Sequence, residues 1–352
     1  MIKHQEYIDL LSKLISIPSF SGSESQTADF IADFVEKKGM YSQRYLNNVF
    51  IRNVHYNDNL PTILLNSHHD TVKPNEGYSK DPFSPIIENG ALYGLGSNDA
   101  GGSLVSLLAT FSHFYDAELP FNLIYAATAE EEISGHNGIE ALLPKLGTID
   151  CGIVGEPTEM NIAIAERGLL VLDCTVSGTA SHAAYGSGDN ALYKAMEDIT
   201  FLKEFSFEKS CKYLGNTTLN VTIINGGLQH NVIPDSCTYT IDIRMNAEYT
   251  GEDIIALLQP HLHATIKPRS LRLRPSIIEE NHIFIKAGKA LHIPLYPSLT
   301  MSDQALMPFP TIKFGPGNSH RSHTADEFIF LSEIYEGIEL YIQFLTKLRD
   351  IS

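Results

Sequence analysis

Three short apolar runs constrain the fold of this chain more than any other feature. They cover residues 62–65, 121–127 and 152–154, and none of them alternates between apolar and polar side chains. Strands buried on both faces of a parallel sheet have this pattern, whereas half-exposed strands alternate. A helical pattern from Ser103 to Tyr115 lies between two of the runs. Strand–helix–strand crossovers therefore predict an α/β domain with a mostly parallel central sheet flanked by helices.

The strands predicted after Gly168 have a different pattern. Segments 170–176, 218–224 and 238–244 show mixed or alternating polarity, as expected of a sheet that is covered on one side only. A helical pattern at 190–203 separates two of these strands. This part of the chain is therefore expected to form an α+β domain of its own.

We accordingly predict two domains, which also suits a length of 352 residues. A catalytic, metal-binding domain comprises residues 1–167 and 277–352. An inserted α+β domain of ferredoxin-like type, serving as a lid or dimerisation domain, comprises residues 168–276. Near the N-terminus, Ser21 and Glu24 make a capping-box pattern, which predicts a helix from there to about Gly39.

Charge and cysteine content exclude several functional classes. The chain carries 25 basic and 42 acidic residues, a formal net charge of −17, which argues against nucleic acid or an anionic membrane as a partner. The four cysteines form no CxxC motif, which is typical of a cytoplasmic protein with free thiols. The longest apolar runs contain polar residues well before they reach membrane-spanning length.

Five acidic or histidine clusters carry the chemistry, and most of them directly follow an apolar run. They are Ser67–Asp70, Ser97–Asp99, Glu130–Glu132, Gly155–Pro157 and Ser322–Thr324. Carboxylates and histidines gathered at the ends of adjacent parallel strands can hold two metal ions that activate water. Each cluster alone could be a solvated loop or a helix cap, but the ordered set predicts a hydrolase.

The spacing within the first cluster predicts that the side chains of two adjacent histidines point in different directions. Residues two apart in an extended segment face the same way, so His68 and Asp70 share a face and His69 points elsewhere. We interpret His68 as a metal ligand and Asp70 as the carboxylate that orients it. Alternatively, His69 is the ligand or both histidines are structural.

The second cluster lies in a glycine-rich turn, residues 94–102, before the predicted helix. Such turns also bind phosphates, but the Walker lysine and the dinucleotide spacing are missing. Asp99 could lend one oxygen to each of two metals, or it could simply cap the helix. In the loop of residues 315–323, which leads into the last cluster, either His320 or His323 could bind metal.

The acidic triplet Glu130–Glu132 follows a strongly apolar strand. Adjacent like charges and burial both raise carboxyl pKa values, so one of these side chains would suit a general base near neutral pH. A solvated loop is the alternative.

Together these motifs resemble the M20 family of metal-dependent peptidases and deacylases, over essentially the whole chain. The branch of acetylornithine deacetylase and succinyl-diaminopimelate desuccinylase is the most similar. The resemblance implies that Asp99 bridges two metals and that Glu131 is the general base. Asp70 would orient His68. The remaining metal ligands would be His68 and Glu156 on the first metal and Glu132 and His323 on the second.

The resemblance also assigns residues of the inserted domain. His182 would reach into the site of a partner subunit and stabilise the oxyanion, so a homodimer formed through the insertion is expected. Arg244 would hold a substrate carboxylate, and Asn231 lies in a segment similar to the substrate-contacting loop of the family. One departure is Gly101, where many relatives have a lysine.

The implied activity is hydrolysis of the linear amide of an N-acyl amino acid, with two Zn²⁺ ions; the ligand set also admits Co²⁺ or Mn²⁺. An acetylornithine-like substrate, and hence arginine biosynthesis, is our first expectation. N-acetyl- or N-succinyl-citrulline and N-succinylornithine fit the same chemistry. The alternatives are a dipeptidase or aminopeptidase of the family, succinyl-diaminopimelate desuccinylase, and a catalytically inactive metal-binding homologue.

Overall fold

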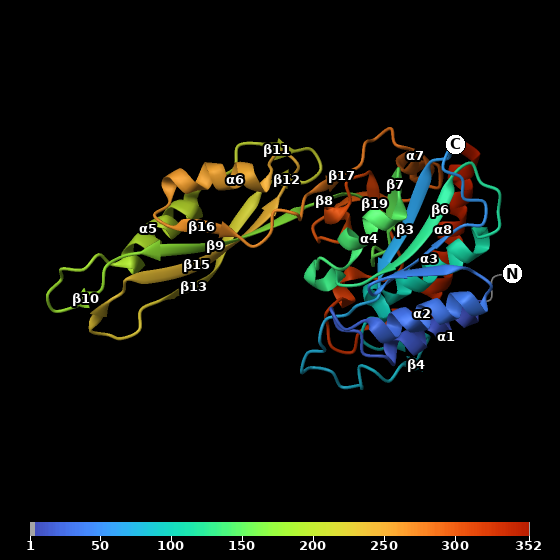
Figure 1. Cartoon of the computed structure of the whole chain (residues 1–352), viewed down its shortest axis with the longest axis horizontal. Coiled ribbons are helices and arrows are strands. Elements are labelled where there is room, and N and C mark those ends of the chain that lie inside the picture. The colour runs from blue at the N-terminus through green and yellow to red at the C-terminus, as the bar shows by residue number, and fades with distance from the viewer. Residues whose placement is uncertain (1–3, 352) are drawn as a thin grey trace. The chain divides into compact units, whose positions relative to one another are not determined.

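The computed structural model describes residues 4–351, which form two compact units (Figure 1). The α/β unit comprises Met1–Ile164, Ile277–Tyr296 and Ser302–Ser352. The inserted unit comprises Ala165–Ser276 and Pro297–Met301. The functions predicted for the two domains remain predictions.

A mixed sheet forms the centre of the α/β unit. Its four middle strands are mutually parallel and lie in the order β6, β3, β7, β19. Antiparallel pairing adds β2 and then β1 at one side, and β8 at the other. These strands are β1 (Ser42–Tyr45), β2 (Asn48–Arg52), β3 (Thr62–His68), β6 (Asn122–Thr128), β7 (Cys151–Val154), β8 (Ile162–Glu166) and β19 (Thr311–Lys313), while β17 (Ser276–Ile277) and β18 (Leu295–Ser298) also pair at the β8 side. The predicted α/β class is confirmed.

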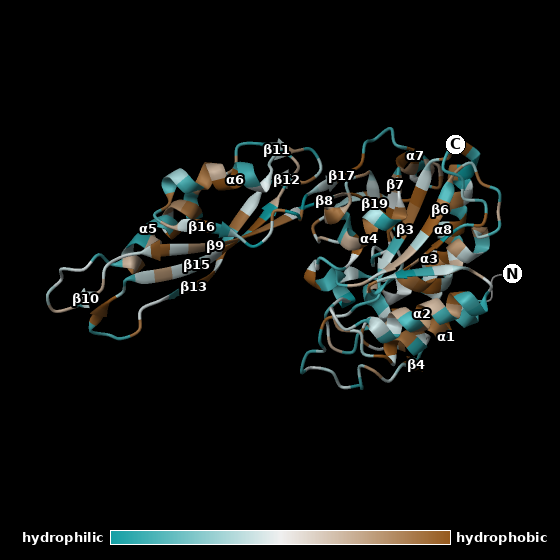
Figure 2. Ribbon diagram, viewed as in Figure 1, coloured by the Kyte–Doolittle hydropathy of each residue, from teal (hydrophilic) through white to brown (hydrophobic). Residues whose placement is uncertain are grey.

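Helices cover both faces of this sheet. On one face, α4 (Ile139–Leu146) packs against Leu64 and Ile124. On the other face, Phe111 of α3 (Gly102–Phe114) contacts the Tyr125 ring, with centroids 6.1 Å apart. Figure 2 shows brown, apolar residues along the central strands, whereas α1 and α2 carry both brown and teal residues. The other helices of this unit are α1 (His4–Ile15), α2 (Ser25–Lys37), α7 (Ile283–Ala290) and α8 (Leu331–Ile351).

The predicted helix after Ser21 is present, but the capping box is wrong. No side chain caps the N-terminus of α2. Ser21 Oγ instead donates to Asp70 Oδ2 at 2.7 Å, and the Glu24 carboxylate accepts hydrogen bonds from Asn47 and from the backbone of Glu130. The Ser21 hydroxyl is therefore taken by a long-range contact, whereas the Glu24 carboxylate combines long-range contacts with a local one, the backbone N–H of Gly22 at 2.5 Å.

A small three-stranded sheet, which the sequence analysis did not predict, joins distant parts of the chain. It orders β20 (Phe328–Phe330), β5 (Ala91–Tyr93) and β4 (Ile86–Glu88), all antiparallel. The pairing of β20 with β5 holds the segment after His323 beside the glycine-rich turn.

The inserted unit is a four-stranded antiparallel sheet with two helices. Along the chain its elements follow the order β9–α5–β13–β15–α6–β16, and the sheet order is β13-β15-β9-β16, which is the ferredoxin-like arrangement. Burial alternates along β9, as predicted for a sheet with one covered face. The bounds are β9 (Gly168–Ser177), α5 (Ala191–Glu204), β13 (Thr218–Gly226), β15 (Ser236–Met245), α6 (Gly251–Leu258) and β16 (Thr265–Pro268), and two short pairs join β10 (Ser181–His182) to β14 (Val232–Ile233) and β11 (Ser210–Cys211) to β12 (Gly215–Asn216).

Among the helices of residues 4–351, none combines the length and the apolarity that a membrane span requires.

Candidate metal centre

The parallel strands bring three of the predicted clusters to one edge of the central sheet. His68 is the last residue of β3 and pairs with Thr128, the last residue of β6. Glu131 and Glu132 follow β6 after two residues, and Glu156 follows the neighbouring strand β7. Because carboxyl ends of parallel strands meet at the same edge, residues that are far apart in sequence gather here.

His68 lies at the centre of this cluster. Its Nε2 is 3.3 Å from Asp99 Oδ1, 3.7 Å from Glu156 Oε1 and 3.9 Å from Glu131 Oε2. Two groups of side chains could hold a metal ion: His68 with Glu131 and Glu156, and His68 with Asp99 and Glu132. In both groups the potential ligand atoms lie within 4.8 Å of one another.

Asp99 extends the cluster toward the last predicted motif. Its Oδ1 faces His68, and its Oδ2 is 3.7 Å from His323 Nε2. His323 Nε2 also lies 2.9 Å from Glu132 Oε2. Within residues 4–351, neither of the two groups of potential ligands includes His320 or His323, and the contacts to Asp99 and Glu132 are what bring His323 to the cluster. An Asp99 that directs one oxygen to each side is the arrangement expected of a bridging carboxylate.

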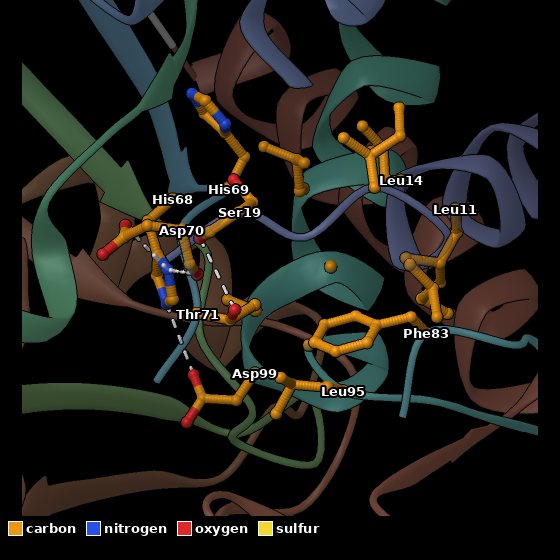
Figure 3. A pocket seen from close by; sticks show the side chains of 16 residues that line it. Leu11, Leu14, Ser19, His68, His69, Asp70, Thr71, Phe83, Leu95 and Asp99 are labelled. Carbon is orange, nitrogen blue, oxygen red and sulfur yellow. Dashed lines mark hydrogen bonds and ion pairs between the residues drawn. The ribbon is translucent and has the colours of Figure 1, made fainter. Parts of the chain in front are cut away.

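The two adjacent histidines point in different directions, as their spacing predicts (Figure 3). His68 points toward Asp99. His69 points away: its Nδ1 lies 2.9 Å from Thr27 Oγ1 and its Nε2 lies 2.9 Å from the carbonyl oxygen of Asn47. Burial lowers the pKa of His69 to about 4, so His69 is a neutral structural residue at neutral pH.

Asp70 links His68 to the acidic triplet. Its backbone oxygen lies 3.0 Å from His68 Nδ1, and its Oδ1 is 3.4 Å from the same nitrogen. The carboxylate also accepts the backbone N–H groups of Glu131 (3.0 Å) and Glu132 (3.2 Å). Asp70 therefore fixes the orientation of the imidazole and of the turn that carries both glutamates.

Several side chains at this edge of the sheet have shifted pKa values. Burial raises the pKa of Glu131 well above its usual range and that of Glu156 to about 8, and the neighbouring acids add to both effects. The hydrogen bond to Glu132 raises the pKa of His323 to about 9. Perturbed groups that are clustered in this way are typical of functional sites.

The donor set fits divalent cations. Oε1 of Glu156 is buried and has no hydrogen-bond partner within the described part of the chain, a costly state for a carboxylate oxygen unless a cation approaches it. The cluster consists of imidazole nitrogens and carboxylate oxygens without sulfur, which suits zinc and also admits cobalt or manganese.

Sequence reasoning missed two buried acids near the cluster. Asp303 Oδ2 accepts hydrogen bonds from Asn66 and Thr128 at the ends of β3 and β6. Glu327 accepts three backbone N–H groups from the glycine-rich turn. Their partners lie more than 170 residues away in sequence, so no local motif signals them, although Glu327 does occupy the last position of the His-Thr-x-x-Glu pattern.

The absence of a lysine at position 101 has a steric reason. A side chain there would begin 2.3 Å from the carbonyl oxygen of Gly96 and 2.5 Å from Leu11 Cδ1. Gly101 therefore suits this particular turn, in which the chain passes close to α1.

The predicted substrate-binding residues belong to the inserted unit. His182 is exposed on β10, next to the segment of Asn231, whose carbonyl oxygen accepts Ala183 N–H at 2.9 Å. Arg244 on β15 forms a two-point ion pair with Asp242, at 2.8 and 3.0 Å. None of the three belongs to the unit that carries the acidic cluster, and their roles remain predictions.

A buried cluster of imidazole and carboxylate groups at the strand ends of an α/β fold is the kind of site that metal-dependent hydrolases use. Residues 64–347 match the family model described as Peptidase family M20/M25/M40. Because the match covers most of the sequence, the chain belongs to this family of hydrolases.

Individual relatives include enzymes of different specificity. The chain is 27% identical to a succinyl-diaminopimelate desuccinylase of Wolbachia pipientis, over 96% of this chain and 92% of the relative. It is 25% identical to a probable carboxypeptidase of Aspergillus flavus, over 97% of this chain and 87% of the relative. In fold it is similar to the aminopeptidase PepT of Bacillus cereus, with a TM-score of 0.80, 18% identity and 99% of each chain covered.

Proposed function

We propose that this M20 hydrolase cleaves the linear amide bond of an N-acyl amino acid in a metal-dependent reaction. The observation that carries the proposal is the buried cluster around His68, in which Asp99, Glu131 and Glu156 all place an oxygen within 3.9 Å of one imidazole nitrogen. Such a concentration of acids is expensive to bury unless cations offset it.

The chain offers ligands for two divalent cations. His68 and Glu156 would hold the first, Glu132 and His323 the second, and Asp99 would contact both. When bound, the cations would supply Lewis acidity to the amide carbonyl and to an attacking water. Zn²⁺ is the proposed metal, with Co²⁺ or Mn²⁺ as substitutes.

Glu131 is the proposed general base. The hydrogen bond from its backbone N–H to Asp70 fixes its position, and burial raises the pKa of its carboxyl group well above the usual range, which makes it a stronger proton acceptor. Glu131 would take a proton from the attacking water and pass it to the leaving amine. Asp70 holds the turn on which this side chain is mounted.

Residues of the inserted unit would complete substrate binding. Arg244 would hold the α-carboxylate, for which a planar guanidinium is suited, and in the structure its guanidinium pairs with Asp242 of the same strand. Asn231 would contact the substrate beside it. His182, contributed by the partner of a homodimer, would stabilise the oxyanion.

Exposed apolar surface on the inserted unit supports the homodimer. The strand β13 forms an edge of the sheet, and its Ile223 and Ile224 are nearly half exposed. On α5, Tyr193 and Met196 are 66% and 57% exposed. Apolar residues along an unpaired strand edge favour association with a second chain.

The acyl group distinguishes the candidate substrates. An acetylornithine-like compound, used in arginine biosynthesis, is the first candidate, and the N-acetyl or N-succinyl derivatives of ornithine and citrulline share its chemistry. N-succinyl-diaminopimelate is the second candidate, favoured by the similarity to desuccinylases along almost the whole chain.

A hydrolysis screen of the metal-loaded protein tests the proposal. The substrates would be N-acetylornithine, N-acetylcitrulline, N-succinylornithine, N-succinyl-diaminopimelate and a set of dipeptides, with release of the free amine as the signal. We expect cleavage of at least one N-acyl amino acid that disappears on chelation. Cleavage of dipeptides alone would assign the protein to the peptidases of the family, and no cleavage by a metal-loaded protein would favour an inactive metal-binding homologue.

A further inference from the structure

Glu327 forms an unusually complete set of contacts with the turn that carries Asp99. Its Oε1 accepts the backbone N–H groups of Asn98 at 2.8 Å and Asp99 at 2.9 Å, and its Oε2 accepts that of Gly96 at 2.9 Å. Its own backbone oxygen accepts Gly94 N–H at 2.9 Å. The side chain is buried, with 2% of its surface exposed. One residue therefore satisfies four donors of a single turn.

The turn needs such an acceptor because its backbone is irregular. Gly96 has φ +75°, and Asp99 has a non-helical φ of −117° and ψ of 99°. A side chain at position 96 would begin 2.6 Å from Thr71 Cγ2, so the turn is also closely confined on another side. The N–H groups of an irregular buried turn cannot bond to a helix or sheet ladder, and they require another partner.

The position of Glu327 is itself fixed. The next residues form β20, in which Phe328 pairs with Tyr93 and Ile329 with Leu92 of β5. His323, four residues before Glu327, reaches Glu132 Oε2 at 2.9 Å. The short segment from His323 to Ile329 thus connects the acidic cluster, the glycine-rich turn and a sheet.

Asp70 offers a direct parallel on the other side of the cluster. Its carboxylate accepts the backbone N–H groups of Glu131 and Glu132 and so holds the turn that presents those side chains. Glu327 makes the same kind of contact with the turn that presents Asp99. Two of the three segments that carry carboxylates of the cluster are therefore held through their backbone by a buried acid from a distant part of the chain.

We propose that Glu327 is a positioning residue of the metal centre, which fixes the direction in which Asp99 presents its two oxygens. This inference rests on the proposed function, because it requires Asp99 to be a metal ligand. Residues that orient ligands in this way typically change metal affinity or activity 10–100-fold when they are replaced.

The test is the affinity of Glu327→Gln for Zn²⁺, measured by competition with a chromophoric chelator, and the visible spectrum of the Co²⁺-loaded protein. An amide oxygen can still accept two N–H groups, but its NH₂ group opposes the third, so the turn shifts while the side-chain volume is kept. We expect Zn²⁺ affinity to fall about 10–100-fold, with an altered Co²⁺ spectrum and a lower kcat at saturating metal.

Glu333→Gln is the matched control. Glu333 accepts Phe330 N–H at 2.8 Å and pairs with Arg321 at 2.7 Å, so it stabilises the same region without contacting the Asp99 turn. Its Zn²⁺ affinity should equal that of the wild type. A purely structural role of Glu327 would lower the melting temperature of its variant but leave Zn²⁺ affinity of the folded protein unchanged, and that result would overturn the inference.

Two further outcomes are separable. If Glu327→Gln does not fold, Glu327→Asp replaces it in the test, because aspartate keeps the negative charge on a side chain one methylene shorter. Weaker Zn²⁺ binding by Glu327→Asp would support the inference. Zn²⁺ affinity equal to that of the wild type would overturn it. If the wild type itself binds no Zn²⁺, the proposed function fails first, and the inference fails with it.

Discussion

One buried carboxylate from each unit shows a contrast in hydrogen bonding, Asp198 in the inserted unit and Glu156 in the α/β unit. In the inserted unit, Asp198 accepts hydrogen bonds from the Tyr239 hydroxyl at 2.9 Å and from the backbone N–H groups of His263 at 2.8 Å and Ala264 at 3.0 Å. In the α/β unit, Oε1 of the buried Glu156 has no hydrogen-bond partner within the described residues. A buried carboxylate whose oxygens accept hydrogen bonds stabilises its fold. A buried carboxylate oxygen that accepts none, next to other acids, indicates a place for a ligand.

The surrounding structure explains this difference. Asp198 lies on α5 above an apolar core that includes Leu172, Tyr239 and Ile241, and its partners come from the same unit. The acids of the α/β unit that surround His68 instead gather from separate segments where parallel strands end. The inserted unit is therefore expected to tolerate loss of metal, and the α/β unit is not.

Replacement of the proposed base should have the largest effect. Glu131→Gln removes the proton acceptor but keeps the shape of the side chain, so kcat should fall about 10²–10⁴-fold with metal content unchanged. Steady-state kinetics and elemental analysis would measure both quantities. Glu88→Gln, at an exposed acid paired with Lys80 on the same unit, is the control. Retained activity in Glu131→Gln would remove this residue from the mechanism.

Metal removal should separate the two units. Binding at 1,000 times the dissociation constant stabilises the folded form by about 4 kcal/mol, and only the unit that holds the ligands gains this energy. Hydrogen exchange with and without a chelator should therefore show faster exchange in β3, β6 and β7 but not in β9 or β15. Equal acceleration in both units would contradict a metal site confined to the α/β unit.

Replacement of Asp198, whose carboxylate is fully hydrogen-bonded, should affect stability alone. Asp198→Ala leaves the Tyr239 hydroxyl and two backbone N–H groups without their acceptor, which should cost about 3 kcal/mol of unfolding free energy. Urea unfolding would measure this cost, and Zn²⁺ affinity should not change. Asp173→Ala, which removes an exposed pair with Arg269, should have a much smaller effect. Weaker Zn²⁺ binding in Asp198→Ala would contradict the expectation that acids of the inserted unit affect stability alone.

The smallest expected effect is a pH dependence of the metal-free protein. Burial raises the pKa of Glu156 from 4.5 to about 8, so between these pH values the unfolded chain releases a proton that the folded chain retains. Stability should therefore fall as pH rises from about 5 to 8, by about 1–2 kcal/mol because neighbouring acids share the protons. Glu156→Gln should flatten this slope, as urea unfolding at several pH values would show. An unchanged slope would mean that Glu156 is not the titrating group.

Much of the architecture was predictable because it depends on local patterns. The non-alternating runs identified β3, β6 and β7, and the period of two separated His68 from His69. The same runs fixed where the acidic motifs gather, because parallel strands must end at one edge. The ferredoxin-like order of the inserted unit agrees with the alternating strands predicted there.

The remaining features depend on contacts between distant segments. Ser21 and Glu24 read locally as a capping box, but Asp70, 49 residues after Ser21, takes the hydroxyl. Glu327 accepts a hydrogen bond from Gly96, which lies 231 residues earlier in the sequence, and Asp303 accepts one from Asn66, which lies 237 residues earlier. Asp303 lies in no motif, and the His-Thr-x-x-Glu pattern that contains Glu327 does not show what this side chain contacts, so the tertiary structure reveals both roles.

The central claim is that the acidic edge of the α/β unit binds the catalytic metals through Asp99. Equilibrium dialysis of the wild type and of Asp99→Asn against Zn²⁺ tests it most directly. The account predicts two Zn²⁺ ions per wild-type chain and loss of most of this binding in the folded variant. A wild type that binds less than one Zn²⁺, or an Asp99→Asn variant that binds both ions with unchanged affinity, would contradict it.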